Sequence, residues 1–242
     1  MEQRLLAREK ASPSVRLDAK VRLLSLQLEE AYTRFWNHPR LAEFVPHLLF
    51  RMHCETRAAV HLMDEARRQL SRIAESEPLA TGLIRYFEQL SHEEQGHDDW
   101  LLNALESLGE TRVEVRARMP PPTVAAMIGM QYYWTYHHHP VALLGFIKVV
   151  ENDPSSAEQI ERIKKLTGLP RNAFSYHLGH VHLEAQHNAL LDSVLDSLPL
   201  TPEHEALIGM NAARTIHYMA QSLNEIITLF EANPRVSATP AP

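Results

Sequence analysis

The chain is organised around the stretch Tyr176-His177-Leu178-Gly179-His180-Val181-His182-Leu183-Glu184-Ala185-Gln186-His187. If this stretch is helical, His180, Glu184 and His187 occupy positions i, i+4 and i+7, so their side chains project from one face over two turns. Two imidazoles and a carboxylate on one helix face are a typical layout of metal ligands. The stretch therefore predicts a long helix that presents ligands to the interior of a helical protein.

Two further segments carry the same ligand chemistry. Glu94-Gln95-Gly96-His97 has a Glu and a His three positions apart, and Glu151 ends the apolar run 141–150. A carboxylate after such a run is either at the surface or stabilised by a positive group. Helical bundles build metal sites from Glu and Glu-x-x-His sets on facing helices. We expect six residues to meet in the core and to hold two iron ions: Glu94, His97, Glu151, His180, Glu184 and His187.

Several neighbouring residues compete for a place in this site. Glu93 can reach the same face as His97, and we choose Glu94 over it. His177 shares the His180 face and could orient a ligand through a hydrogen bond. His61 and Glu65, at i and i+4, and the nearby Glu55 are reserve ligands.

The spacing of apolar residues at three and four positions, with only 8 glycines, indicates an all-α chain. We expect one helical domain over residues 1–242, with frayed ends at about 1–12 and 234–242, and a bundle of about seven or eight helices. Residues 110–122, which end in three prolines, are expected to form an extended connection. The expected helices run from about Ser14 to Trp36, His47 to Ile73, Thr81 to Leu108, Val124 to Tyr136, Val141 to Glu151, Ser155 to Thr167 after an Asp153-Pro154 cap, Asn172 to Leu198, and Pro202 to Phe230.

Composition excludes several classes of function. A formal net charge of −6 argues against nucleic acid as a partner, and no apolar run is long enough to span a membrane. The N-terminus has no apolar signal segment, and Cys54, the single cysteine, excludes an intrachain disulfide, so we expect a cytoplasmic protein. There is no Gly-rich phosphate loop and no Gly-x-Ser-x-Gly motif. The 15 histidines stand out instead.

Three motifs together resemble a known family. Residues 92–109, residues 142–151 and the set His180-x3-Glu184-x2-His187 are similar, in order and spacing, to the haem-oxygenase-like di-iron oxidases and oxygenases, also called iron-containing redox enzymes. Their fold is shared with thiaminase II and pyrroloquinoline-quinone synthase, and the resemblance covers about residues 45–230. It implies a haem-oxygenase-like helical bundle with the six ligands named above. Two positions depart from the family pattern: Glu184 stands where Asp is common, and Leu90 where several members have a ligand or polar group.

The resemblance also implies an activity. It indicates dioxygen activation by two Fe(II) ions, with O2 as co-substrate, for the oxidation of a small metabolite that resembles an amino acid or a fatty acid, by N-oxygenation, desaturation or C–C scission. An external electron donor and a homodimer are compatible with this expectation. Two alternatives remain: a metal-independent enzyme on the same fold, either a thiaminase-like enzyme that uses Cys54 as nucleophile or a cofactorless oxidase, and a helical binding protein without enzymatic activity.

Overall fold

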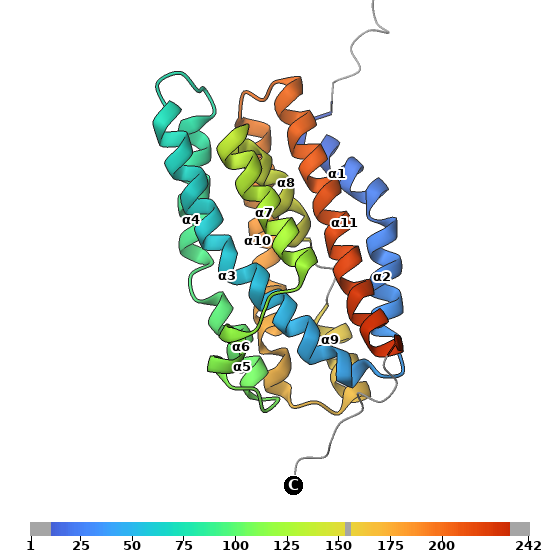
Figure 1. Cartoon of the computed structure of the whole chain (residues 1–242). Helices are drawn as coiled ribbons and strands as arrows, with labels where there is room; N and C mark the ends of the chain where they lie inside the picture. Colours follow the sequence, from blue (N-terminus) through green and yellow to red (C-terminus); the bar gives the residue numbers. More distant parts are fainter. Residues whose placement is uncertain (1–10, 153–155, 233–242) are drawn as a thin grey trace, which may run out of the picture.

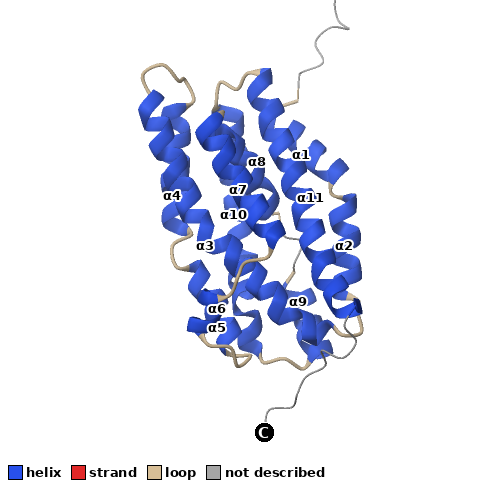
Figure 2. Cartoon of the chain, in the orientation of Figure 1, coloured by secondary structure: helices blue, strands red, loops and turns tan. Residues whose placement is uncertain are grey.

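The computed structural model describes residues 11–152 and 156–232, with only the backbone of residues 181–185. Every regular element in these ranges is a helix (Figure 2). The expectation of an all-α fold is therefore confirmed. The α-helices are α1 (Pro13–Leu24), α2 (Leu26–Trp36), α3 (Leu41–Ile73), α4 (Ala80–Glu93), α5 (His97–Glu106), α6 (Arg112–Ala117), α7 (Pro122–His137), α8 (Leu143–Val150), α9 (Ala157–Thr167), α10 (Ser175–Ser197) and α11 (Pro202–Ala232), and short 3-10 helices span Pro140–Ala142 and Arg171–Phe174.

The long helices lie side by side, with α5, α6 and α9 gathered at one end (Figure 1). Helix α3 packs against α4, α5 and α7, and α11 packs against α8, α2, α7 and α1. The buried apolar residues of all these helices form a single cluster. In the part of the chain that the structure describes, no helix combines the length and apolarity that crossing a bilayer requires.

The N-terminal helices differ from the expected ones in three places. The predicted helix to Trp36 is divided at Ser25, whose hydroxyl donates to the Val21 carbonyl at 2.8 Å, a contact that bends helices. Ser14 is not the N-cap of the first helix, since it lies inside α1 after the N-cap Ser12, and its hydroxyl donates to Asp196 at 2.8 Å. Helix α3 begins at Leu41 rather than at His47 and contains Pro46. Only one backbone hydrogen bond is lost there, and the burial of residues 41, 44 and 45 outweighs it.

The predicted helix from Thr81 to Leu108 is also divided. Its two parts, α4 and α5, meet at Gly96, which has a φ of 83°. Because that left-handed conformation favours glycine, Gly96 marks the turn. Residues 110–122 are not wholly extended, since Thr111 and Glu114 form a capping box that starts α6. The proposed cap at Asp153-Pro154 lies outside the described residues, as do most of the predicted frayed ends, and α9 is capped by Ser156.

Buried polar contacts fix α8 against its neighbours. Lys148, which is 4% exposed, lies between Asp18 of α1 and Asp192 of α10, with 2.8 Å from its Nζ to each carboxylate. Asn188 of α10 donates to the Glu151 carbonyl at 2.6 Å. These contacts hold the end of α8, and with it Glu151, against α10.

Candidate metal centre

The turn between α4 and α5 brings Glu94 and His97 together. They were expected as an i, i+3 pair on one helix, but Glu94 is the C-cap of α4 and His97 the first residue of α5. The turn at Gly96 keeps them adjacent, so that His97 Nδ1 donates to Glu94 Oε2 at 2.9 Å. Both side chains are buried, at 7% and 5% exposed for Glu94 and His97. The expected pairing holds although the helical reason for it was wrong.

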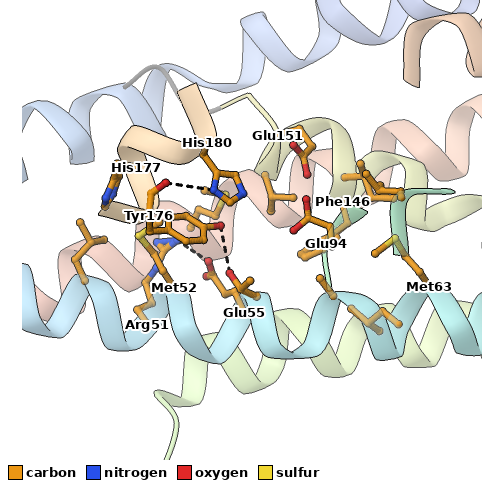
Figure 3. Close-up of a pocket in the computed structure, with 18 of the residues that line it drawn as sticks. Arg51, Met52, Glu55, Met63, Glu94, Phe146, Glu151, Tyr176, His177 and His180 are labelled. Carbon is orange, nitrogen blue, oxygen red and sulfur yellow. Dashed lines mark hydrogen bonds and ion pairs between the residues drawn. The ribbon is translucent and has the colours of Figure 1, made fainter. Parts of the chain in front are cut away.

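Helix α10 supplies His180 and His187, as its sequence spacing indicated. The His180 ring stacks on Tyr176 at 4.0 Å between centroids, and its Nδ1 donates to the Tyr176 carbonyl at 3.3 Å (Figure 3). This hydrogen bond leaves Nε2 free of a proton and able to bind a cation. The side chain of Glu184, the third predicted ligand of this helix, lies outside the described residues.

Glu151 reaches the same region from the C-cap of α8. Its Oε2 accepts a hydrogen bond from His187 Nδ1 at 2.9 Å, and the same nitrogen lies 3.6 Å from Glu94 Oε1. Figure 3 shows the carboxylates of Glu94 and Glu151 beside the His180 ring. The structure thus brings together all five predicted ligands whose side chains it describes.

These five residues form two groups that share one member. Glu94, His97 and His180 offer ligand atoms within 4.8 Å of one another, and so do Glu94, Glu151 and His187. Two donors bound at about 2.1 Å and at right angles on one cation lie about 3 Å apart, which matches the two 2.9 Å contacts. Glu94 Oε1 is buried and has no hydrogen-bond partner. The residues therefore fit two cations with Glu94 between them.

The electrostatics of the cluster reflect these contacts. Burial acts to raise the pKa of Glu94, but the hydrogen bond from His97 and the charges of the nearby histidines lower it by more. The pKa of Glu94 is therefore below its usual value. Burial raises the pKa of Glu151, partly offset by the His187 hydrogen bond. Burial lowers the pKa of His180 to about 4, so its ring is neutral near neutral pH. Glu94 and His180 are thus in the protonation states that a metal requires.

One supporting contact was not found from the sequence. The Trp100 ring lies against His97 in a tilted arrangement, with 4.2 Å between the ring centroids, and meets His180 edge-on at 5.9 Å. It fits because position 179 is glycine: a Cβ there would lie 2.9 Å from Trp100 Cζ3. Gly179 and Trp100 together orient both imidazoles. A glycine one residue before a candidate ligand was the only signal for this contact in the sequence.

A cavity adjoins the cluster. Its volume is about 100 Å³, and most of its lining is apolar. Glu94, Glu151 and His180 reach it from one side, and Arg51, Glu55, Tyr176 and His177 form a polar end (Figure 3). Leu90, at the position where several family members have a polar group, is a buried part of the lining.

The other predicted candidates belong to neither ligand group. Glu93 is exposed, although its Oε2 comes within 3.2 Å of His187 Nε2. His61 is exposed, and Glu65 accepts a hydrogen bond from Gln69 and pairs with Arg68. Cys54 is buried outside the cavity lining, and burial raises the pKa of its thiol to about 11.

Comparisons with solved structures show the fold. A heme oxygenase-like domain of unknown function from Shewanella denitrificans superposes with a TM-score of 0.76 at 16% identity, over 94% of this chain and 97% of that one. A TenA homologue from Pseudomonas syringae gives 0.65 at 10% identity, over 88% and 91%. A CADD-like protein of unknown function from Nostoc punctiforme gives 0.64 at 16% identity, over 89% and 98%. The comparison with curated proteins gives no match.

The fold and the cluster define the class of protein: an all-α, heme oxygenase-like bundle with an acidic and imidazole-rich centre beside a cavity. The profile of the family described as iron-containing redox enzymes matches residues 56–219, which is more than half of the chain. The chain belongs to this family of iron-containing redox enzymes. The family resemblance predicted from the three sequence motifs is thereby confirmed.

Proposed function

We propose that the chain binds two ferrous ions between α4, α5, α8 and α10 and activates dioxygen to oxidise a small metabolite. The observation that carries this proposal is the sharing of Glu94 by the two ligand groups. A carboxylate has two oxygens and can bridge two cations, and Glu94 presents one oxygen to His97 and the other toward His187. The third carboxylate, Glu184, is proposed to complete the set.

The ligand chemistry favours iron. Imidazoles with carboxylates suit iron that reacts with dioxygen, because they leave coordination positions open and tolerate a change of oxidation state. When bound, the two ferrous ions supply electrons to dioxygen. The surrounding residues hold the ligand side chains in place, and the burial of the cluster keeps bulk water from the reacting atoms. For His97 Nδ1 and His187 Nδ1 to bind a cation, the protons that they donate to Glu94 and Glu151 would have to leave to solvent.

The substrate is proposed to be a small metabolite in the adjoining cavity, similar to an amino acid or a fatty acid, that undergoes N-oxygenation, desaturation or C–C scission. Desaturation removes fewer electrons from a substrate than the complete reduction of dioxygen consumes. For that reaction we expect an external electron donor. The chain is proposed to act in the cytoplasm, and a homodimer is compatible with the proposal.

The thiaminase-like alternative is disfavoured by Cys54. Such an enzyme needs a reactive thiolate in its pocket. The Cys54 thiol is 5% exposed, is absent from the cavity lining and has a pKa of about 11. The binding-protein alternative predicts that iron has no effect on the chain, which the following experiment tests.

The test is an anaerobic titration of the full chain with Fe(II), followed by exposure to air in an oxygen electrode. We expect two irons per chain and dioxygen uptake faster than that of the same Fe(II) in buffer. His180→Ala and His187→Ala each remove a ligand of one group and should reduce binding to one iron or none. His61→Ala, at an exposed position of α3, is the matched control. Absence of iron binding by the unsubstituted chain, or two irons retained by both variants, refutes the proposal.

A further inference from the structure

The polar end of the cavity contains an ion pair that the proposed metal chemistry does not use. Arg51 and Glu55 lie one turn apart on α3, and Arg51 Nη2 donates to Glu55 Oε2 at 2.8 Å. Their side chains are 3% and 12% exposed, and both line the cavity. Burial of a charged pair is costly unless its remaining hydrogen-bonding groups are satisfied. The pair therefore needs partners that the chain does not fully supply.

Two atoms of this pair are unsatisfied. Arg51 Nη1 donates to Ser222 Oγ at 3.1 Å, but Arg51 Nε and Glu55 Oε1 are buried without a hydrogen-bond partner. Burial raises the pKa of Glu55, and the neighbouring Arg51 only partly opposes this. One open donor and one open acceptor, on groups of opposite charge, remain at the same end of the cavity.

This end is next to the metal centre. The ring of Tyr176 stacks on His180, and its hydroxyl lies 3.4 Å from Oγ1 of Thr56, the residue that follows Glu55 in α3 (Figure 3). Only one aromatic ring therefore separates His180 from the polar end. Arg51 and Glu55 therefore line the same cavity as the candidate ligands Glu94 and Glu151.

The opposite end of the cavity is apolar. Met63 and Phe146 belong to the lining there. Figure 3 places Met63 and Phe146 on the other side of Glu94 from Arg51. From Glu55 to Leu62 the helix rises about 10 Å, at 1.5 Å per residue. The cavity thus matches a short molecule with a polar head and an apolar tail.

We propose that Arg51 and Glu55 bind the zwitterionic head of an amino acid with an apolar side chain. The ammonium group binds Glu55 Oε1, the carboxylate binds Arg51 Nε, and the side chain lies beside Glu94 and points toward Met63. The inference that this amino acid is the substrate rests on the proposed function, whereas the binding itself does not.

The charges favour a zwitterion over either single-charge head. A fatty acid would place its carboxylate beside Glu55 without a second cation, and a simple amine would place its ammonium beside Arg51 without a second anion. Both bury a charge next to a like charge. A zwitterion places its ammonium beside Glu55 and its carboxylate beside Arg51, so each charge has an opposite neighbour. Glu55 Oε1 and Arg51 Nε then each gain a charge-assisted hydrogen bond.

The first test compares three probes of similar length by isothermal titration calorimetry: L-norleucine, hexanoate and n-pentylammonium. The full chain is titrated in EDTA and again after addition of Fe(II) under argon. We expect L-norleucine to bind at least about tenfold more tightly than either single-charge probe, because each of these lacks one charge-assisted contact. Hexanoate or n-pentylammonium binding as tightly as L-norleucine, or no binding of L-norleucine, overturns the proposal.

The second test assigns the contact to Glu55. Glu55→Gln keeps the shape of the side chain and removes its charge, and we expect the Kd of L-norleucine to rise at least about tenfold. Glu65→Gln is the matched control, since Glu65 is a buried carboxylate of the same helix outside the cavity lining. An unchanged Kd in Glu55→Gln contradicts the assignment. Because the titration in EDTA needs no iron, loss of iron binding would refute the metal proposal and leave this result standing.

Discussion

Gly179→Ala tests whether Trp100 orients the candidate ligands. A Cβ at position 179 would lie 2.9 Å from Trp100 Cζ3 and 3.5 Å from Cε3. Ordinary contacts begin at 3.4 Å, so the indole must move by at least 0.5 Å, the difference between 3.4 and 2.9 Å. Trp100 is only partly buried and can swing outward, away from the His97 ring that it contacts. The substitution thereby removes support from two ligands without touching either.

The expected effect is on metal affinity rather than on stability. Loss of groups that orient metal ligands typically weakens metal binding about 10- to 100-fold, or about 1.4 to 2.8 kcal/mol. The same substitution raises helix propensity by up to about 1 kcal/mol, because Gly179 lies inside α10. Metal affinity should therefore fall while the metal-free chain unfolds at an unchanged or higher urea concentration.

The assay is an anaerobic Fe(II) titration that is monitored by tryptophan fluorescence. Urea unfolding of the metal-free chain is measured in parallel. Gly129→Ala is the matched control, since Gly129 lies in α7 at an exposed position and a Cβ there meets nothing within 4 Å. Gly179→Ala with the Fe(II) affinity of the unsubstituted chain would refute the role given to Trp100. So would an equal loss of affinity in Gly129→Ala.

Three further predictions concern other sites. Because the pKa of Cys54 is about 11 rather than 9.0, its thiolate is about 100-fold scarcer than that of a free thiol; iodoacetamide should label the native chain at least that much more slowly than the urea-unfolded chain, and equal rates would contradict this. Gly96→Ala should lower the free energy of unfolding by about 1–2 kcal/mol, because φ there is 83°; unchanged urea unfolding would show that the turn has adjusted. Burial lowers the pKa of His53 in the folded chain, so as the pH decreases below 6.5 this histidine is protonated in the unfolded chain before it is protonated in the folded one, and the free energy of unfolding should fall. His53→Gln should reduce that fall, and a variant with the same pH profile as the unsubstituted chain would disprove the assignment.

The helical fold was predictable because its signal is repeated many times along the chain. Apolar residues at helical spacing marked most of the helices, and prolines and glycines marked several ends. The division between α4 and α5 was missed, because a single helix was predicted through Gly96, whose φ of 83° makes it the turn between them. The start of α3 was predicted too late for the opposite reason: Pro46 was expected to precede the helix, but it lies inside α3, because the burial of the first residues of α3 outweighs the local effect of the proline.

The metal centre was partly predictable for a different reason. His180 and His187 follow from spacing on one helix, and Glu151 stood out because it ends an apolar run. Contacts between distant segments left no such pattern. The approach of Trp100 to Gly179, and the open atoms of Arg51 and Glu55, depend on how α3, α5 and α10 pack. Such contacts require coordinates.

The most direct test of the account is anomalous diffraction at the iron edge from crystals grown with Fe(II) under argon. We predict two iron peaks about 3.5 Å apart, both within bonding distance of Glu94, with His97 and His180 at one and Glu151 and His187 at the other. A single peak, or two peaks of which only one contacts Glu94, would contradict the proposal that this carboxylate joins two metal sites.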